Sequence, residues 1–402
     1  MSKNLLIAFS LASLFGCSQP GTAPSDSGST PTGPGRVPSG ATDAGGTRGP
    51  TGVPVSGAPD LSSPGTPDLT AANPQDGAGP PAPDLAGPAQ AQAPAHHRCG
   101  WLQVTDPAGK ASFLANASWF DAIHPDWYAM NSDGITIRPI LATDDPDVLA
   151  AATQNHVQVI PLVASVENTA WTRTMLYSAQ NRTAHIQTLV QTAVSHGYAG
   201  LDLDYEHLWD SADAAPLQAF IQEFATAMHG AGKLASMAVP ALDSMPQPIW
   251  NYANLAASLD QVHVMAYDFH TIGTHAGPTS PLGWIDAVAA QAQATGAAGK
   301  FVLGLPNYGV TSTSACPLAT CAASCTGALA TSTDHMLTCP FGNYTAGRSL
   351  NCDTAAGALF FDDTQSLEEK VMTVQSHGLG GVTYWTVGNE PAGFLAMVRK
   401  YY

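Results

Sequence analysis

The sequence predicts an α/β protein: a (β/α)8 TIM barrel with a cysteine-rich insert after its seventh strand, preceded by a disordered tether. Beyond residue 98, short β-rich segments alternate with helical patterns, which is typical of βαβ units and a parallel sheet. This part is about 300 residues long, the size of one barrel. Residues 18–97, in contrast, contain no Phe, Trp or Tyr. We therefore expect one folded domain at residues 98–402.

Residues 1–17 predict an export signal. Lys3 precedes an apolar run at residues 5–15 that is too short to span a bilayer, and small residues follow it. The stretch Leu14-Phe15-Gly16-Cys17 resembles the lipobox of bacterial lipoproteins, whose cysteine is acylated. We expect Cys17 to carry a lipid anchor on an outer or cell-surface membrane; an ordinary cleaved signal with a chance cysteine would make the protein secreted.

Residues 18–97 predict a linker. Pro, Gly, Ser, Thr and Ala dominate this segment, so it cannot bury enough apolar surface to offset the entropy of the chain. A flexible coil of this length spans on the order of 50 Å, enough to lift a domain clear of a membrane.

The net charge of −17 excludes nucleic acid as a partner, because the phosphate backbone would be repelled. Such a surface suits a neutral or cationic substrate. Solubility outside the cell explains it as well.

Eight segments predict the strands of a closed barrel, and two strong helical patterns lie between them. Ile186, Leu189, Val190, Ala193 and Val194 recur at helical spacing, and Gly197 follows at a C-cap position; Leu217, Phe220, Ile221, Phe224 and Met228 repeat the pattern. The expected strands are residues 100–105, 119–128, 157–164, 198–206, 233–239, 261–268, 300–306 and 380–386.

Residues 310–363 form an insert after the seventh strand, on the barrel face where active sites are built. Without Cys17, six cysteines remain. An even number in an oxidising compartment favours disulfides over metal ligation, and the pairing stays open. The cysteines are Cys99, Cys316, Cys321, Cys325, Cys339 and Cys352. His96 and His97 have no neighbouring ligands at metal-site spacing, so we expect no metal and no cofactor.

A strand with three alternating acids is the strongest functional feature. Because side chains alternate along a strand, Asp202, Asp204 and Glu206 share one face, roughly 6.6 Å apart. An exposed face of an antiparallel strand would accommodate them at no cost. In a parallel sheet covered on both faces, however, they point into the barrel, where like charges are costly, and this indicates a functional site.

These residues resemble the Asp-x-x-Asp-x-Asp-x-Glu signature of glycoside hydrolase family 18, the chitinase family, with Ala199 in place of the first Asp. Further motifs follow in the order of that family. Met265-Ala-Tyr-Asp268 is similar to its Met-x-Tyr-Asp, Gly304-Leu-Pro-Asn-Tyr-Gly309 to its Gly-x-Pro-x-Tyr-Gly, and Gly381-Val-Thr-Tyr-Trp385 to its last strand. The resemblance covers nearly the whole domain.

The resemblance implies a retaining, substrate-assisted hydrolase, in which the acetamido oxygen of the substrate attacks the anomeric carbon. Glu206 would be the general acid and then the base, with a raised pKa. Asp204 would bind the acetamido N–H, Asp202 would hold Asp204 in place, and Tyr267 would donate to the acetamido oxygen. The residues expected to bind the sugar are Asp268, Trp385, Met265 and Tyr308.

The resemblance also suggests the substrate: β-1,4 bonds to N-acetylglucosamine in chitin oligosaccharides or peptidoglycan. Residues 119–134, 277–284 and 360–363 resemble the spore-cortex-lytic and chitobiase-like branches of the family. Two alternatives remain open, a non-catalytic, lectin-like glycan-binding protein and an endo-β-N-acetylglucosaminidase that acts on N-glycans. The expected partners are such a glycan and, through the lipid anchor, a membrane, and we expect a monomer.

Overall fold

A computed structural model describes residues 97–165, 168–242, 249–271, 277–310, 315–319, 330–331, 337–339 and 359–402. The expected signal with Cys17, nearly all of the expected linker, and Cys321, Cys325 and Cys352 lie outside these residues, so the expectations about them stay predictions. None of the described helices is both long enough and apolar enough to cross a membrane.

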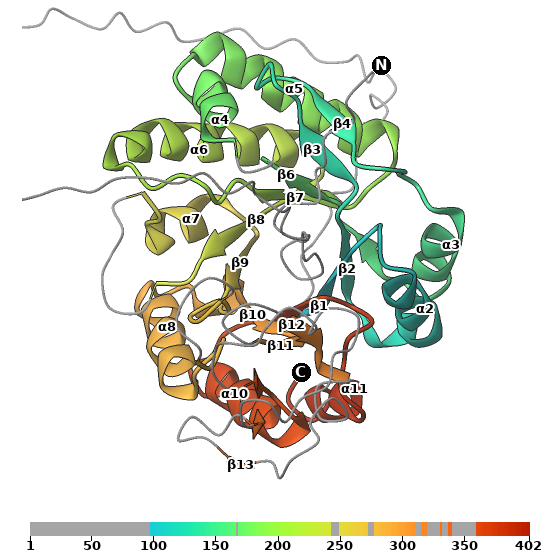
Figure 1. Cartoon of the computed structure of the whole chain (residues 1–402). Coiled ribbons are helices and arrows are strands. Elements are labelled where there is room, and N and C mark those ends of the chain that lie inside the picture. Colours follow the sequence, from blue (N-terminus) through green and yellow to red (C-terminus); the bar gives the residue numbers. More distant parts are fainter. Residues whose placement is uncertain are drawn as a thin grey trace, which may run out of the picture. The chain divides into compact units, whose positions relative to one another are not determined.

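The predicted barrel is confirmed: eight parallel strand positions close into a ring (Figure 1). The second position is divided between β2 and β3, and the third between β5 and β6. β2 pairs with β5, β3 pairs with β6, and β16 pairs with β1, which closes the ring. The strands are β1 (His97–Leu102), β2 (Ala122–Pro125), β3 (Tyr128–Met130), β5 (Gln158–Val159), β6 (Leu162–Ala164), β7 (Gly200–Asp204), β8 (Leu234–Pro240), β9 (Gln261–Met265), β10 (Phe301–Pro306) and β16 (Gly381–Trp385). A short strand, β4 (Ile137–Pro139), pairs with β3 in the antiparallel direction.

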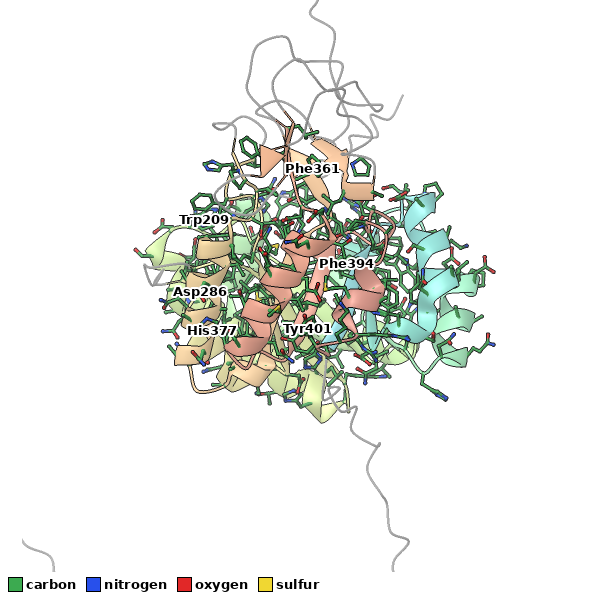
Figure 2. All side chains as sticks on the ribbon, turned by 90° about the horizontal axis from the view of Figure 1, so that it is seen from below. Trp209, Asp286, Phe361, His377, Phe394 and Tyr401 are labelled. Atoms are coloured by element: carbon green, nitrogen blue, oxygen red, sulfur yellow. The ribbon has the colours of Figure 1, made fainter. Side chains whose placement is uncertain are left out.

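Helices surround this ring (Figure 1). They are α2 (Pro107–Asn116), α3 (Pro146–Gln154), α4 (Thr169–Leu176), α5 (Ala179–Ser195), α6 (Ala214–Gly230), α7 (Tyr252–Ser258), α8 (Leu282–Ala294), α10 (Thr364–Ser376) and α11 (Phe394–Val398). Figure 2 shows His377, which follows α10, beside Asp286 of α8, and the His377 Nε2 atom lies 2.8 Å from the Asp286 carboxylate.

The two predicted helices form for the expected reasons. In α5, the Ser178 hydroxyl accepts the N–H of Asn181 as an N-cap, and Gly197 ends the turn with a φ of +71°, a conformation that glycine adopts without strain. Of the predicted apolar stripe, Ile186, Leu189 and Ala193 are buried. Val190 is partly buried, and Val194 is 52% exposed. All five apolar positions predicted for α6 are buried.

The helix-facing side of β7 carries the main apolar core. Leu201, Leu203 and Tyr205 are fully buried there, and the Tyr205 ring stacks on Phe220 at 5.9 Å. The Tyr205 hydroxyl donates to Nε2 of His185, whose Nδ1–H donates to the carbonyl of Ile135, each at 2.6 Å. Both ring nitrogens are thus satisfied when His185 is neutral.

The insert is a small antiparallel sheet of order β12-β11-β15-β14-β13. Its strands are β11 (Tyr308–Val310), β12 (Ala315–Pro317), β13 (Ala330–Thr331), β14 (Leu337–Cys339) and β15 (Leu359–Phe361), and Figure 2 shows Phe361 at one end of the barrel. Directly after β15, Asp362 forms a fully buried ion pair with Lys370 of α10, at 2.6 Å. This pair fixes the point where the chain returns to the barrel.

Cys99 corrects the expectation of six disulfide cysteines. It is a free thiol, fully buried in the barrel interior, and therefore takes no part in stapling the insert. The error arises because an even count of cysteines says nothing about which of them point into a core.

The neutral state of His185 should make the stability depend on pH. Burial lowers the pKa of His185 to about 4, from 6.5. Below pH 6.5, the histidine binds a proton in the unfolded chain but not in the folded one. We therefore expect the free energy of unfolding to keep its full value above pH 6.5 and to fall by on the order of 3 kcal/mol as the pH drops to 4. Urea unfolding across this range should show a weaker pH dependence in His185→Gln. The exposed His156, changed to Asn, is the control; equal slopes in all three proteins would contradict the assignment.

Candidate active site

β7 brings the three predicted acids to one side of the barrel wall. Asp202 is fully buried at the barrel centre, whereas Asp204 and Glu206, toward the carboxyl end of the strand, are partly exposed. Leu201, Leu203 and Tyr205 occupy the opposite face, as a period of two requires.

Asp202 accepts hydrogen bonds from three other strands of the barrel, of which only β8 is adjacent to β7. Ser236 of β8 donates its hydroxyl at 2.8 Å, Trp101 of β1 its indole N–H at 3.2 Å, and His263 of β9 its Nδ1–H at 3.0 Å to each carboxylate oxygen. Nδ1 of His124, on β2, lies 3.4 Å away. Burial alone would raise the pKa of Asp202, but the two histidines outweigh it and hold that pKa well below its usual range.

Asp204 lies in the opposite electrostatic situation. Burial, together with the charge of Asp202, raises its pKa to about 7. Its Oδ1 atom is buried and has no hydrogen-bond partner. Two carboxyl groups on one strand therefore differ in protonation below neutral pH: Asp202 is ionised, and Asp204 carries a proton that it can donate.

Aromatic side chains surround these acids. The Trp101 ring lies 6.3 Å from Tyr267 and 6.2 Å from Trp385, and Tyr267 lies 6.2 Å from Tyr308. Met265 packs in the same layer. The pKa of Tyr267 is raised well above its usual value, first by burial and then by the charges of acids that include Glu206 and Asp204. The Tyr267 hydroxyl is therefore neutral and close to the carboxylates.

Asp268 lies at the edge of this group. The Tyr308 hydroxyl donates to its carboxylate at 2.6 Å, and its backbone N–H donates to the Thr279 hydroxyl at 3.0 Å. The φ of +61° at Asp268 is in the left-handed region, which Asp tolerates better than most residues. All the site residues that the sequence predicts within the barrel therefore lie in this one region of the structure.

The sequence analysis missed four side chains of the site: Trp101, His124, Ser236 and His263. Each points into the barrel from its strand, and the alternation along β1 and β9 could have indicated Trp101 and His263. That they meet Asp202 follows only from the register of the closed ring. On the adjacent strands, for example, this register places Ser236 and Leu162 opposite Asp202.

Chemically, this arrangement combines an acid at the strand end, a neutral carboxyl group, a phenol and an indole around one position. Such groups can protonate a leaving oxygen, bind an amide and support the face of a sugar ring. Within the described part of the chain, Cys99, His124 and His263 form the one cluster of ligands able to hold a metal ion. Two of its members, His263 and His124, lie next to Asp202.

Comparison with known proteins agrees with this geometry. Residues 146–390 match the model of the glycosyl hydrolases family 18. A class V chitinase of Arabidopsis thaliana is 26% identical over 254 residues, which are 54% of this chain and 65% of that protein. The chain spans between 54% and 65% of the length of the first curated relatives it matches.

Two solved structures share the fold. A class V chitinase of Pseudomonas fluorescens Pf-5 superposes with a TM-score of 0.68 at 22% identity, covering 76% of this chain and 98% of that one. The spore cortex-lytic enzyme SleL of Bacillus cereus gives a TM-score of 0.65 at 17% identity, covering 76% and 74%.

Ser236 tests the network around Asp202. Ser236→Ala removes one donor from a fully buried carboxylate, and we expect the free energy of unfolding at pH 7 to fall by about 1–3 kcal/mol. Urea unfolding measures it. Ser195→Ala is the matched control, because its hydroxyl is exposed at the end of α5; its effect should stay within about 0.5 kcal/mol. Equal effects of the two substitutions would contradict the network.

Proposed function

Because the chain belongs to glycoside hydrolase family 18, we propose that it is a retaining glycosidase that cleaves β-1,4 bonds to N-acetylglucosamine with the help of the substrate's own acetamido group. The observation that carries the proposal is the arrangement along β7: Asp202 is held by donors from three strands, Asp204 follows on the same face with a partnerless Oδ1 atom, and Glu206 lies two residues beyond the end of the strand. A protein nucleophile is not needed in this mechanism.

In the first step, the acetamido oxygen forms a bond to the anomeric carbon while the glycosidic C–O bond breaks. Glu206 gives its proton to the departing oxygen. In the second step, a water molecule attacks the anomeric carbon of the oxazolinium intermediate and Glu206 takes the proton of the water. The bond from the acetamido oxygen to the anomeric carbon breaks, which restores the acetamido group and leaves the anomeric carbon in its original configuration.

Asp204 stabilises the charge that develops on the acetamido group. Its partnerless Oδ1 atom is free to accept the substrate N–H, and its carboxyl group shifts toward the ionised form as positive charge grows beside it. Asp202 remains charged throughout, because its donors come from three strands that flank it or face it across the barrel.

The aromatic side chains define where the sugar lies. Trp385 provides an apolar surface for the ring face and the acetamido methyl, and Tyr267 donates its hydroxyl to the acetamido oxygen. Met265 and Trp101 fill the space beneath them. Asp268, held by Tyr308, offers a further acceptor to the sugar hydroxyls.

Glu206 opposes the lectin-like alternative. A protein that only binds glycans needs the aromatic surface but has no use for an acid at the end of β7 or for a neighbouring carboxyl group with a pKa of about 7. For this reason we favour hydrolysis over binding alone.

We extend the proposal to the substrate and the location. The chitinases and the spore cortex-lytic enzyme among the relatives support chitin oligosaccharides or peptidoglycan as substrates. Export with a lipid anchor at Cys17, or secretion, would place a monomeric enzyme beside such polymers, and residues 18–97 would give it reach.

Glu206→Gln should abolish turnover and leave binding intact. Loss of one general acid costs about 10²–10⁴ in rate, whereas the amide keeps the shape of the side chain. Release of sugar from chitooligosaccharides measures the rate, and calorimetric titration with the same oligosaccharides measures binding. His156→Asn, on the exposed surface, should match the wild type in both. A rate within about tenfold of the wild type would assign the acid elsewhere.

Tyr267→Phe should lower kcat and leave the fold intact. The substitution removes only the hydroxyl that is expected to meet the acetamido oxygen, and removal of one such donor costs about 10²–10³ in rate. Steady-state kinetics on chitooligosaccharides measure the change. An unchanged kcat would take the phenol out of the mechanism.

A product profile on chitooligosaccharides and on purified peptidoglycan would separate these two substrate classes. Release of N-glycans from a glycoprotein would instead support the endo-β-N-acetylglucosaminidase alternative.

A further inference from the structure

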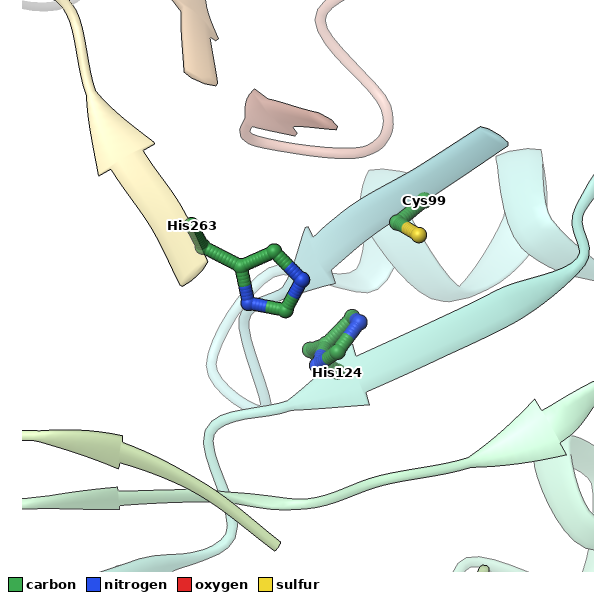
Figure 3. Close-up of side chains that lie close together, drawn as sticks. All are labelled: Cys99, His124 and His263. Carbon is green, nitrogen blue, oxygen red and sulfur yellow. The ribbon is translucent and has the colours of Figure 1, made fainter. Parts of the chain in front are cut away.

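Three side chains of types that can bind a metal meet inside the barrel, two from the adjacent strands β1 and β2 and one from β9, which is distant in the sequence. Cys99 of β1, His124 of β2 and His263 of β9 are each 0% exposed. Their ligand atoms lie within 4.8 Å of one another, and Figure 3 shows the three side chains converging, with one ring nitrogen of His263 directed away from its own strand toward the other two. The proposed glycosidase mechanism uses none of them as a reacting group.

His124 is the observation that calls for a ligand. It is completely buried, and neither of its ring nitrogens has a hydrogen-bond partner, although Nδ1 lies within ion-pairing distance, 3.4 Å, of the Asp202 carboxylate. A buried polar group without a partner is costly, because it loses its hydrogen bonds to water and gains none in return, and native proteins rarely leave one in this state. An ion bound to a nitrogen of His124 would remove the cost.

Asp202 orients His263 as carboxylates orient metal-binding histidines. Its oxygens accept from Nδ1 of His263, which fixes the proton on that nitrogen and leaves Nε2 as the ligand atom. Without an ion, this Nε2 donates a hydrogen bond to the amide oxygen of Gln261 at 3.1 Å. A metal ion bound at Nε2 would take the place of that proton.

The surroundings suit such a site. Cys99 packs against Ala122, Ile160 and Leu234, an apolar layer that excludes water. One thiolate and two imidazoles form a donor set that suits Zn²⁺ better than Ca²⁺ or Mg²⁺, which take oxygen ligands.

We propose that the barrel interior binds one Zn²⁺ ion through Cys99, His124 and His263, as a structural ion beneath the catalytic strand. The thiol of Cys99 and Nε2 of His263 each release a proton to solvent as their bonds to zinc form, and the two positive charges of the ion are balanced by the thiolate and the Asp202 carboxylate. Because all three ligands are buried, the ion enters while the strands close into the ring. The ion takes no part in the reaction.

The metal content of the full chain tests the site. The protein is folded with Zn²⁺ present, dialysed against a chelator to remove surface ions, and analysed by plasma mass spectrometry. We expect one zinc ion per chain in the wild type and in His156→Asn, and at least about a tenfold lower content in Cys99→Ser. Equal zinc in Cys99→Ser and the wild type would overturn the proposal, as would a wild type without zinc.

Cobalt separates this site from the cysteines of the insert. Folding with Co²⁺ in place of Zn²⁺ should give the intense visible bands of a tetrahedral ion and a near-ultraviolet sulfur-to-cobalt band. Both should disappear in Cys99→Ser and in His124→Asn. If the sulfur band survives in Cys99→Ser, another thiolate holds the ion and the proposal is wrong.

The wild type alone decides the question if the variants fail to fold. Denatured wild-type chain is refolded with one equivalent of Zn²⁺ or with a chelator, and thermal unfolding is followed by circular dichroism. A higher Tm in the zinc-folded sample, together with retained zinc, supports the site. Identical melting curves without retained zinc would refute it.

Discussion

A carboxylate without solvent contact, Asp202, is the constraint on which the barrel interior depends. A buried charge is tolerated only when it is paired and its oxygens are hydrogen-bonded, and here β1, β8 and β9 each supply a donor while β2 places His124 nearby. This requirement explains why indole, hydroxyl and imidazole groups occupy positions that branched aliphatic side chains fill in most barrels.

The same charge divides the work between neighbouring acids. Asp204 lies two residues further along β7, yet its carboxyl group keeps a proton at a pH where that of Asp202 has lost one. Environment, not residue type, sets this difference: one carboxylate faces donors, and the other faces a charge of its own sign. The strand thus presents an incoming sugar with a graded series of acids from the barrel centre to its rim.

Much of the fold followed from local patterns, and much of the site did not. Hydrophobic periodicity located eight strand positions and the helices α5 and α6, because each pattern is written in consecutive residues. Asp202, Asp204 and Glu206 were visible for the same reason. Trp101, His124 and His263 were not, since their meeting depends on ring closure between strands far apart in the chain. The prediction that Cys99 forms a disulfide was wrong for a related reason. Its side chain points from β1 into the barrel interior, and the number of cysteines in the sequence cannot reveal this.

The two ends of the insert are fixed independently of what lies between them. At its start, the backbone N–H of Asn307 donates to the carbonyl of Trp385 at 2.8 Å, and at its end Asp362 and Lys370 form their buried pair. Because each end is held by contacts within the barrel, a change confined to the residues between them need not shift the strands that carry the acids.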